Sequence, residues 1–317
     1  MKTIVTGISS FIGRNTAKQL VRDHHETYGV IRVKSRMKPE EAKKLLGVKD
    51  VISLDFDDIP NANSAGFFAY LDNSVFQTFG RFDCWLHFAW DGVGSAGRSD
   101  PEIQRRNVEN AQKAYRIAQW LGCKLFVFAG SQAEYGKGNA ETPLPVSEYG
   151  KAKLQFALWA KNEAEKKKDI SFLHLRLFSV YGPGDHVTSL VSTCIQTLLE
   201  GGDFKAGPCT QKWNYMFIDD CARAICTLAE KPAEAPYRAI DIASAEGRPL
   251  KNYVRTIFEM CGGKGRISFG VRENNAEGAA DLLPNTETLK KEGFTENYTF
   301  EDGIQRTIDA IKGVDGH

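Results

Sequence analysis

Tyr149 and Lys153 stand four positions apart in the segment YGKAK, and Ser131 precedes them in the same stretch of chain. Residues at this spacing on a helix lie one above the other on the same face. A phenol normally ionises near pH ~10, and a neighbouring ammonium group stabilises the phenolate form and lowers that pKa. The three residues therefore predict a tyrosine acid/base, tuned by the lysine, with the serine hydroxyl bonding the same reacting oxygen.

A surface tyrosine beside a solvated lysine gives the same spacing, so the surrounding elements decide between the two interpretations. An apolar run over residues 124–130, KLFVFAG, predicts a buried strand that ends directly before Ser131. A helix is expected from Tyr149 to about residue 168. A serine at the carboxyl end of a parallel strand can hydrogen-bond the oxygen on which Tyr149 would act.

The amino-terminal residues carry a glycine turn between a strand and a helix. Residues 2–6 form a short run rich in β-branched side chains, and apolar residues at helical spacing follow Gly7. The turn contains Gly7, Ser10 and Gly13 in place of three glycines, so Ser10 stands where the backbone must approach a pyrophosphate. A dinucleotide-binding turn is predicted, and an ordinary turn between a strand and a helix is the alternative.

Basic residues follow the second predicted strand, residues 27–33. Proteins that bind NAD usually have an acidic residue at the end of this strand, which accepts from the ribose hydroxyls. Arg32, Lys34 and Arg36 occupy this region instead. Because cations suit the additional 2′-phosphate of NADP, NADP(H) is favoured over NAD(H). A solvated, lysine-rich helix start is the alternative.

Strands and helices alternate through the first part of the chain, which predicts an α/β fold with a Rossmann-like, doubly wound parallel sheet. After Asp185, helical stretches are separated by short runs with glycine and proline, which predicts a smaller C-terminal α/β substrate lobe. We expect a dinucleotide-binding domain over residues 1–178 and a substrate lobe over residues 179–317, with segments around 211–245 returning to the first domain. The other expected strands cover residues 51–58, 82–90, the first part of 170–185, and 237–244, and the other expected helices cover residues 101–122, 189–200, 219–231 and 250–261.

The composition excludes several other classes of protein. Lys+Arg number 41 and Asp+Glu 40 in 317 residues, so no charge excess favours binding to nucleic acid or to a membrane surface. No stretch is long and apolar enough to span a bilayer, and the first residues resemble a strand more than a signal peptide. The seven cysteines show no Cys-x-x-Cys spacing, and no His/Asp/Glu cluster has the spacing of metal ligands. We expect a cytoplasmic protein without a metal site.

Several sequence landmarks occur in the order that is typical of one family. They are TGISSFIG, LDFD, HFAW, RNVENAQKA, GSQAEYG, YGKAK, RLFSVYGPGD and YMFIDDCARAI. Over its whole length the chain resembles the extended short-chain dehydrogenase/reductase superfamily, in its NAD-dependent epimerase/dehydratase branch. The resemblance implies a nicotinamide cofactor and a nucleotide-activated sugar as substrate.

The resemblance also implies roles for individual residues. Tyr149 would donate or accept the proton at the substrate oxygen, Ser131 would be the active-site hydroxyl, and Lys153 would hold the nicotinamide ribose and tune Tyr149. Asn107 matches an asparagine that steadies the strand ends, and a purely structural role is equally expected for it. Together with the basic residues after the second strand, the expected cofactor contacts are Thr6, Gly7, Ser10, Phe11, Ile12, Gly13, Arg32, Arg36, Asp55, Phe56, Phe88, Ala89, Trp90 and Lys153.

The chain departs from the family pattern at positions that bear on the reaction and the substrate. Sugar-nucleotide 4,6-dehydratases carry an Asp-Glu pair after the active-site hydroxyl, whereas Gln132 and Ala133 stand there in this chain. Neither side chain can move a proton, which argues against dehydration. The expected substrate contacts are Ser179, where many epimerases have an asparagine, Trp213, where an arginine is common, and Arg272, where an arginine usually grips the diphosphate. A core role for Trp213 and a surface role for Arg272 are the alternatives.

The leading prediction is an NADP(H)-dependent reductase of a nucleotide-activated 4-keto sugar. The segment FGVRENN and the C-terminal lobe most resemble the 4-ketoreductase members of the family. A nucleotide-sugar 4-epimerase that uses the same residues is the first alternative. A reductase of a non-nucleotide carbonyl and a non-catalytic NADP(H)-sensing protein are the others. Relatives pair two helices from each subunit, so the resemblance implies a homodimer through residues 101–122 and 149–168.

Overall fold

The chain divides into two units that alternate along the sequence, in a computed structural model that describes residues 1–232, 234–272 and 283–313. Each unit is therefore built from segments that are separate in the sequence. The first unit consists of Met1–Glu134, Pro145–Arg176 and Ala222–Ile240, and the second consists of Tyr135–Leu144, Leu177–Cys221 and the described residues from Asp241 onward.

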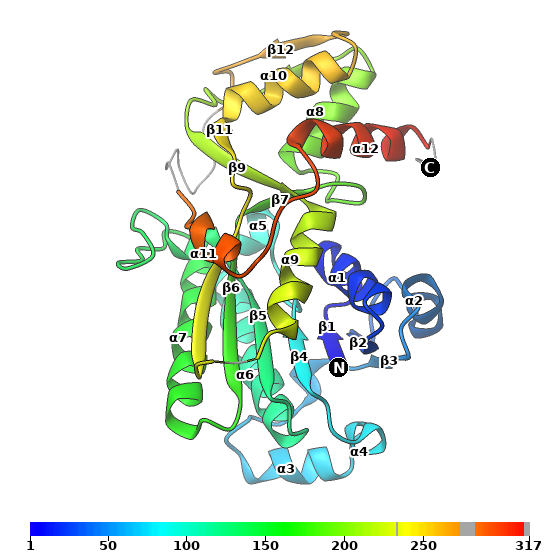
Figure 1. The fold of residues 1–317 in the computed structure, drawn as a ribbon, viewed down its shortest axis with the longest axis vertical. Coiled ribbons are helices and arrows are strands. Elements are labelled where there is room, and N and C mark those ends of the chain that lie inside the picture. Colours follow the sequence, from blue (N-terminus) through cyan, green and yellow to red (C-terminus); the bar gives the residue numbers. More distant parts are fainter. Residues whose placement is uncertain (233, 273–282, 314–317) are drawn as a thin grey trace. The chain divides into compact units, whose positions relative to one another are not determined.

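A seven-stranded sheet forms the centre of the first unit (Figure 1). Its order is β10-β6-β5-β4-β1-β2-β3, and β1 pairs in parallel with both β2 and β4. The chain thus moves outward from β1 in both directions, and the predicted Rossmann-like, doubly wound α/β fold is confirmed. The strands are β1 (Lys2–Thr6), β2 (Glu26–Ile31), β3 (Asp50–Ser53), β4 (Cys84–His87), β5 (Leu125–Ser131), β6 (Ser171–Leu177) and β10 (Tyr237–Ile242).

Helices connect successive strands of this sheet and pack against it. In Figure 1, α6 and α7 lie side by side, and the two helices contact each other. α1 contacts α9, where Cys226 Sγ lies 3.8 Å from the Thr16 carbonyl oxygen. The helices are α1 (Phe11–Arg22), α2 (Pro39–Leu46), α3 (Ala65–Asp72), α4 (Phe76–Phe79), α5 (Ser95–Arg98), α6 (Pro101–Trp120), α7 (Glu148–Lys167) and α9 (Ile218–Glu230), with the 3-10 helices η1 (Phe56–Asp58) and η2 (Gln132–Glu134).

A side-chain cap fixes where α7 begins, and with it the position of Tyr149. Ser147 is the N-cap residue, and its side chain accepts from the Gly150 amide at 3.1 Å. A serine in this position satisfies one of the amides that have no partner within the helix. Tyr149 therefore lies in the first turn of α7.

Aromatic side chains join α7 to the sheet. The ring of Phe128 on β5 packs edge-to-face on Phe156 of α7, with centroids 4.6 Å apart. Phe126 and Phe172, on β5 and β6, are also fully buried in this cluster. Burying one such ring stabilises the fold by about 1.5–3 kcal/mol. This packing fixes α7 along β5 and sets the height of Tyr149 and Lys153 relative to the strand.

Two strands are shorter than predicted. β2 and β3 pair only as far as Ile31 and Ser53, and residues 56–58 form η1, so the expected strand over 51–58 is wrong in its second half. β4 ends at His87, opposite the last residue of β1, so the expected strand over 82–90 is also too long. The paired strand β2 ends at Ile31 and the paired strand β1 ends at Thr6, and each ladder stops after one further backbone hydrogen bond, from the Leu54 amide to Ile31 and from the Phe88 amide to Thr6.

The second unit contains two small sheets. In the first, β9 pairs antiparallel with β11 and in parallel with β7, and the other consists of β12 and β8. Residues 179–181, expected in the loop after the sixth strand, form β7; the strands β8, β9, β11 and β12 were not predicted. The elements are β7 (Ser179–Tyr181), β8 (Asp203–Lys205), β9 (Lys212–Phe217), β11 (Gly247–Pro249), β12 (Arg266–Ser268), α8 (Leu190–Leu199), α10 (Leu250–Met260), α11 (Thr286–Lys291) and α12 (Phe300–Lys312).

Three further features of the described residues bear on function. None of their helices is long and apolar enough to cross a membrane. Their His, Cys, Asp and Glu side chains form no group that could hold a metal ion. All seven cysteines are buried free thiols.

Candidate active site

Lys153 joins helix α7 to the carboxyl end of β5. Its Nζ donates a hydrogen bond to the Ala129 carbonyl oxygen at 2.6 Å and lies 5.6 Å from the centre of the Tyr149 ring. Ser131, Tyr149 and Lys153 are 8%, 8% and 3% exposed. The structure therefore brings Lys153 and Tyr149 together beside the strand that ends in Ser131, with only the edges of these side chains open to solvent.

Ser131 is held through the short helix η2. Its Oγ accepts from the Ala133 amide at 3.2 Å, and accepting this bond leaves the hydroxyl hydrogen able to donate. A Cβ atom on Gly150 would lie 2.3 Å from the Ala133 carbonyl oxygen, so only glycine lets α7 approach η2 this closely. The first turn of α7, with Tyr149, and the segment after Ser131 are thus in direct contact.

The charge of Lys153 is sensitive to its surroundings. Burial lowers the pKa of Lys153 to about 7, the Glu134 carboxylate opposes this effect, and the Arg98 charge adds to it. An amine with such a pKa changes its charge near neutral pH, which is typical of residues at functional sites.

His87 is buried in the sheet next to this site. Its Nδ1 lies 2.8 Å from the Thr6 hydroxyl, and burial together with the Lys153 charge lowers the pKa of His87 to about 3. The imidazole is therefore neutral, as expected for a core histidine. Thr6, predicted to contact the cofactor, has a fully buried side chain that turns toward His87.

Two cations and the ring of Trp90 lie close to the Tyr149 ring. The guanidinium carbon of Arg98 lies 4.2 Å from the centre of the Tyr149 ring, and Lys153 Nζ lies 3.9 Å from the centre of the Trp90 ring. Trp90 packs edge-to-face on Tyr149, with centroids 6.5 Å apart, and its indole N–H donates to Gln104 at 2.8 Å. Sequence reasoning missed Arg98, because nothing in the local pattern connects residue 98 with the first turn of α7.

Glu134 is a second residue of this region that sequence reasoning missed. Its Oε1 accepts from the Ser131 amide at 2.7 Å, and His174 Nε2 lies 3.0 Å from its Oε2, with both side chains buried. A Cβ atom on Gly130 would lie 2.4 Å from His174 Nε2 and 2.6 Å from Glu134 Oε1. In the sequence, Glu134 is only an acidic residue three positions after Ser131. That spacing does not distinguish a buried, hydrogen-bonded carboxylate from one exposed to solvent.

The turn between β1 and α1 has the close packing that its glycines predicted. Gly7 has a positive φ of 69°, and a Cβ atom there would lie 2.7 Å from the Ala89 amide nitrogen. A Cβ atom on Gly13 would lie 2.3 Å from the Gly7 carbonyl oxygen, so α1 packs directly on the turn. Ser10 caps α1 by accepting from the Gly13 amide at 3.1 Å. A helix amino terminus with a close backbone approach is suited to hold a pyrophosphate.

Other predicted cofactor residues follow this turn or the end of β4. Phe11 and Ile12 are the first two residues of α1 and are half-buried. Phe88 and Ala89 directly follow β4, and the Phe88 amide donates to the Thr6 carbonyl oxygen at 3.0 Å. This bond holds the backbone after β4 against the end of β1, directly before the glycine turn.

Asn107 of α6 fixes the loop beyond Trp90. Its Oδ1 accepts from the Asp91 amide and its Nδ2 donates to the Asp91 carbonyl oxygen, both at 2.9 Å. These two bonds give Asn107 the structural role expected from the sequence. The Asp91 carboxylate forms an ion pair with Arg32, whose side chain is exposed.

The residues expected around the adenine and its ribose lie at the ends of β2 and β3. Asp55 accepts from the Val33 amide at 3.3 Å, and buried Phe56 accepts from Lys113 Nζ through its carbonyl oxygen at 2.7 Å. Arg36 is exposed. Asp55 therefore ties the loop after β2, which carries both predicted phosphate-binding arginines, to the end of β3.

In the second unit, the structure brings two of the predicted substrate residues together. The Trp213 indole N–H donates to Ser179 Oγ at 2.9 Å across the paired strands β9 and β7. The next residue, Asn214, is buried and bonds both the amide and the carbonyl oxygen of Ser244. Arg272 is exposed and its amide donates to the Ala206 carbonyl oxygen at 3.2 Å. The rest of the segment FGVRENN, residues 273–275, lies outside the described residues.

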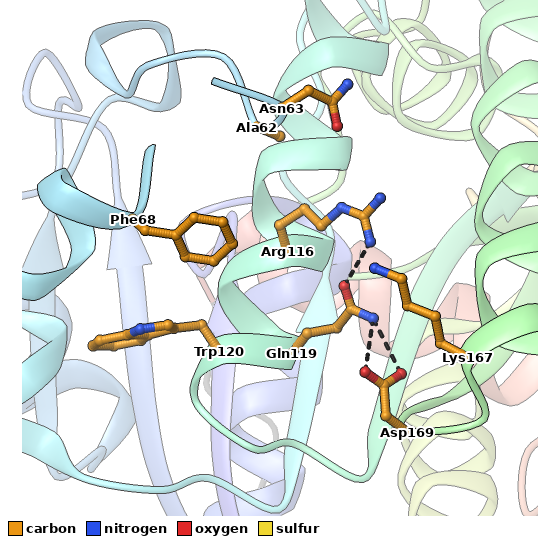
Figure 2. Close-up of a pocket in the computed structure, with 8 residues that line it drawn as sticks. All are labelled: Ala62, Asn63, Phe68, Arg116, Gln119, Trp120, Lys167 and Asp169. Atoms are coloured by element: carbon orange, nitrogen blue, oxygen red, sulfur yellow. Dashed lines mark hydrogen bonds between the residues drawn. The ribbon is translucent and has the colours of Figure 1, made fainter. Parts of the chain in front are cut away.

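A cavity of about 450 Å³ opens elsewhere on the first unit (Figure 2). Its charged groups are already paired, because Arg116 and Lys167 both contact Glu163, at 2.7 and 3.5 Å, and Gln119 donates to Asp169. Asp169 precedes β6 and Trp120 ends α6, so the cavity lies at the amino ends of these strands, whereas Ser131 lies at the carboxyl end of β5. The lining residues are Ala62, Asn63, Phe68, Arg116, Gln119, Trp120, Lys167 and Asp169.

Comparison with known families decides the classification of this chain. The model of the "NAD dependent epimerase/dehydratase family" matches residues 3–243. The chain belongs to this family. Membership in the NAD dependent epimerase/dehydratase family confirms the resemblance that the sequence landmarks indicated, and the match spans both the glycine turn and the Tyr149/Lys153 helix.

Individual members of the family are distant from this chain. CDP-abequose synthase of Salmonella muenchen is 20% identical over 308 residues, with 97% of each chain covered. UDP-glucose 4-epimerase of Corynebacterium glutamicum is 23% identical over 326 residues, with 94% of this chain and 92% of the epimerase covered. Among solved structures, MoeE5 in complex with UDP-glucuronic acid and NAD has a TM-score of 0.82 at 20% identity, and UDP-glucose 4-epimerase of Thermotoga maritima with UDP-glucose has a TM-score of 0.80 at 18% identity. Both cover 99% of this chain and 99% of their own, and at such identity they show the shared fold alone.

Proposed function

We propose that this protein is an NAD(P)-dependent oxidoreductase that acts on a nucleotide-activated sugar and reduces a 4-keto group. The observation that carries the proposal is the placement of Tyr149 and Lys153 beside the end of β5, with Ser131 as the last residue of that strand. The relatives' names, CDP-abequose synthase and UDP-glucose 4-epimerase, support a nucleotide-activated sugar as the substrate class.

In the proposed reaction, a keto group becomes an alcohol by gaining a hydride on carbon and a proton on oxygen. The bound nicotinamide cofactor supplies the hydride. Tyr149 donates its phenolic proton to the carbonyl oxygen, and the Ser131 hydroxyl donates a hydrogen bond that orients the same oxygen. Lys153 favours the phenolate that remains on Tyr149 and would hold the ribose of the cofactor. In the reverse direction, the same groups accept the proton.

Gly7, Ser10 and Gly13 fit the pyrophosphate of such a cofactor, because a close backbone approach and the amino terminus of α1 meet there. For the adenosine end we propose NADP(H) over NAD(H), with Arg32 and Arg36 at the 2′-phosphate. Arg32 would then exchange its ion pair with Asp91 for the phosphate, and exposed pairs of this kind contribute only about 0–1 kcal/mol.

A dehydratase reaction is disfavoured by the residues after Ser131. Gln132 and Ala133 have no titratable group, and the nearby Glu134 is buried with His174 and accepts from the Ser131 amide. Glu134 is therefore engaged inside the unit and is not directed to a substrate. We propose Ser179, Trp213 and Arg272 as substrate contacts, with the Ser179–Trp213 hydrogen bond orienting the indole.

A nucleotide-sugar 4-epimerase is the second candidate, because one of the relatives carries that name and such an enzyme needs the same three residues. An epimerase oxidises and then reduces one substrate, so it retains its cofactor, whereas a reductase must exchange the cofactor in each turnover.

We also propose that the protein forms a homodimer through α6 and α7 and that it is located in the cytoplasm. Analytical ultracentrifugation tests the first, since a monomer at micromolar concentration would contradict it.

The first experiment identifies the nucleotides that purified protein releases on denaturation, by chromatography and mass spectrometry. An empty site that binds NADPH more tightly than NADH, followed by NADPH oxidation with a nucleotide-linked 4-keto sugar, supports the reductase. Stoichiometric retained NAD+ supports the epimerase. In the Tyr149→Phe variant, turnover is expected to fall by about 10²–10⁴ with cofactor affinity unchanged. Normal turnover in that variant would overturn the proposed catalytic role.

A further inference from the structure

Arg98 lies over the face of the ring that is proposed to move the proton. It is the last residue of α5, and this helix contacts α7. Its guanidinium carbon is 4.2 Å from the centre of the Tyr149 ring, well within the distance at which a cation is attracted by an aromatic face. A planar guanidinium suits this stacked position better than an ammonium group does.

The segment that carries Arg98 is closely packed, so its position is defined. A Cβ atom on Gly97 would lie 2.3 Å from Cα of Gly92, which shows how tightly the segment folds back on itself. Gln104, which is 1% exposed, donates to the Gly97 carbonyl oxygen at 2.8 Å and accepts from the Trp90 indole at 2.8 Å. One buried amide thus fixes both the backbone next to Arg98 and the ring of Trp90, and both Arg98 and Trp90 lie close to the Tyr149 ring.

We propose that Arg98 is a positioning residue which holds the Tyr149 ring and, together with Lys153, stabilises its phenolate form. The inference rests on the proposed acid/base role of Tyr149. Ionisation increases the negative charge of the ring and its oxygen, so a cation over the ring face favours the ionised form. Among the described residues, the charged groups near the phenol include Arg98 on α5 and Lys153 on α7, and Glu134 on η2 acts on Lys153.

The two cations differ in how they respond to pH. Burial lowers the pKa of Lys153 to about 7, so its ammonium group loses its proton as the pH rises above neutrality. A guanidinium group stays charged over the whole range in which proteins remain folded. Arg98 therefore maintains a positive charge at Tyr149 under conditions in which Lys153 no longer does.

A titration of Tyr149 tests this inference without any substrate. The ultraviolet absorbance of tyrosinate is followed against pH, and Tyr149→Phe in each background separates this residue from the other tyrosines. In Arg98→Met the midpoint of the Tyr149 titration is expected to rise by about 0.5–1 pH unit, and Arg98→Lys is expected to restore part of the shift. Arg106→Met, which removes an exposed arginine of α6, is the matched control and leaves the midpoint unchanged.

An unchanged Tyr149 midpoint in Arg98→Met would overturn the inference. If that variant melts at a lower temperature than the wild type, Arg98→Gln, which retains a polar side chain, provides the same comparison. If the Tyr149 midpoint shifts in Arg98→Met but the wild-type protein turns over no nucleotide sugar, the role of Arg98 is supported and the proposed function is contradicted. With both supported, the alkaline limb of the pH profile of kcat/KM for the reduction moves to higher pH by the same amount in Arg98→Met, because Tyr149 must be protonated to donate, while the affinity for NADPH stays unchanged.

Discussion

At the scale of single residues, Lys153 links the stability of the protein to the chemistry proposed for it. The ordinary pKa of a lysine is 10.5, and burial lowers that of Lys153 to about 7 in the folded state. Between these two values the unfolded chain binds more protons than the folded one, so the free energy of unfolding rises with pH across this window. Below pH 7 the buried charge destabilises the fold in full.

Lys153→Met is expected to remove this pH dependence along with the activity. The difference in the free energy of unfolding between the wild type and Lys153→Met should change in favour of the wild type from pH 7 to pH 9, by at most about 1.4 kcal/mol per pH unit. Urea unfolding at several pH values measures this difference. Lys151→Met, on the exposed face of the same helix, is the control and should behave as the wild type does. Parallel pH profiles for Lys153→Met and the wild type would show that the ammonium is not buried as described.

At the scale of elements, the site depends on how closely helix α7 approaches the end of β5. Ser147 determines where the helix begins, Phe156 packs it on the strand, and Gly150 permits contact with η2. The periodic pattern of the sequence predicted both elements with bounds close to those observed. It contained no signal for the contact between Gly150 and Ala133, because a glycine in the first turn of a helix has many explanations.

Gly150→Ala is therefore expected to destabilise the protein although alanine is the better helix former. Alanine gains about 1 kcal/mol in helix propensity, but its Cβ atom would lie 2.3 Å from a backbone oxygen that cannot move aside, and such overpacking costs about 1–3 kcal/mol. The displaced first turn should also lower turnover. Gly66→Ala, near the start of α3 with its closest neighbour at 3.8 Å, is the matched control and should stabilise the protein. Equal effects of the two substitutions would contradict this explanation.

At the scale of the whole molecule, the chain passes repeatedly between two units. Residues 135–144 leave the first unit between Ser131 and Tyr149 and belong to the second. The proposed catalytic residues and the glycine turn all lie in the first unit, whereas Ser179, Trp213 and Arg272 lie in the second. The proposed cofactor contacts therefore lie in the first unit and the proposed substrate contacts in the second. Substitutions in the second unit can be tested for an effect on cofactor binding, and substitutions in the first for an effect on substrate binding.

Cofactor binding should stabilise the protein in proportion to its affinity. NADPH at a free concentration of about 100 times its Kd is expected to raise the free energy of unfolding by about 2.7 kcal/mol, and NADH should need a higher concentration for the same effect. Arg32→Gln combined with Arg36→Gln should remove this difference by weakening NADPH binding alone. Thermal unfolding with titrated cofactor provides the measurement, with Lys44→Gln on α2 as the control. Equal stabilisation by both cofactors in the wild type would contradict the preference for NADP(H).

The sequence by itself determined the class of fold, the glycine turn and the shared helix face of Tyr149 and Lys153. These features follow from local periodicity, since residues four apart on a helix must be neighbours wherever the helix lies. Only the tertiary structure decided the rest: the depth at which Lys153 is buried, the buried Glu134–His174 pair, the hydrogen bond between Trp213 and Ser179, and the position of Arg98 over Tyr149. Each of these contacts joins residues from different elements, so it depends on how the loops and helices pack against one another and not on any pattern along the chain.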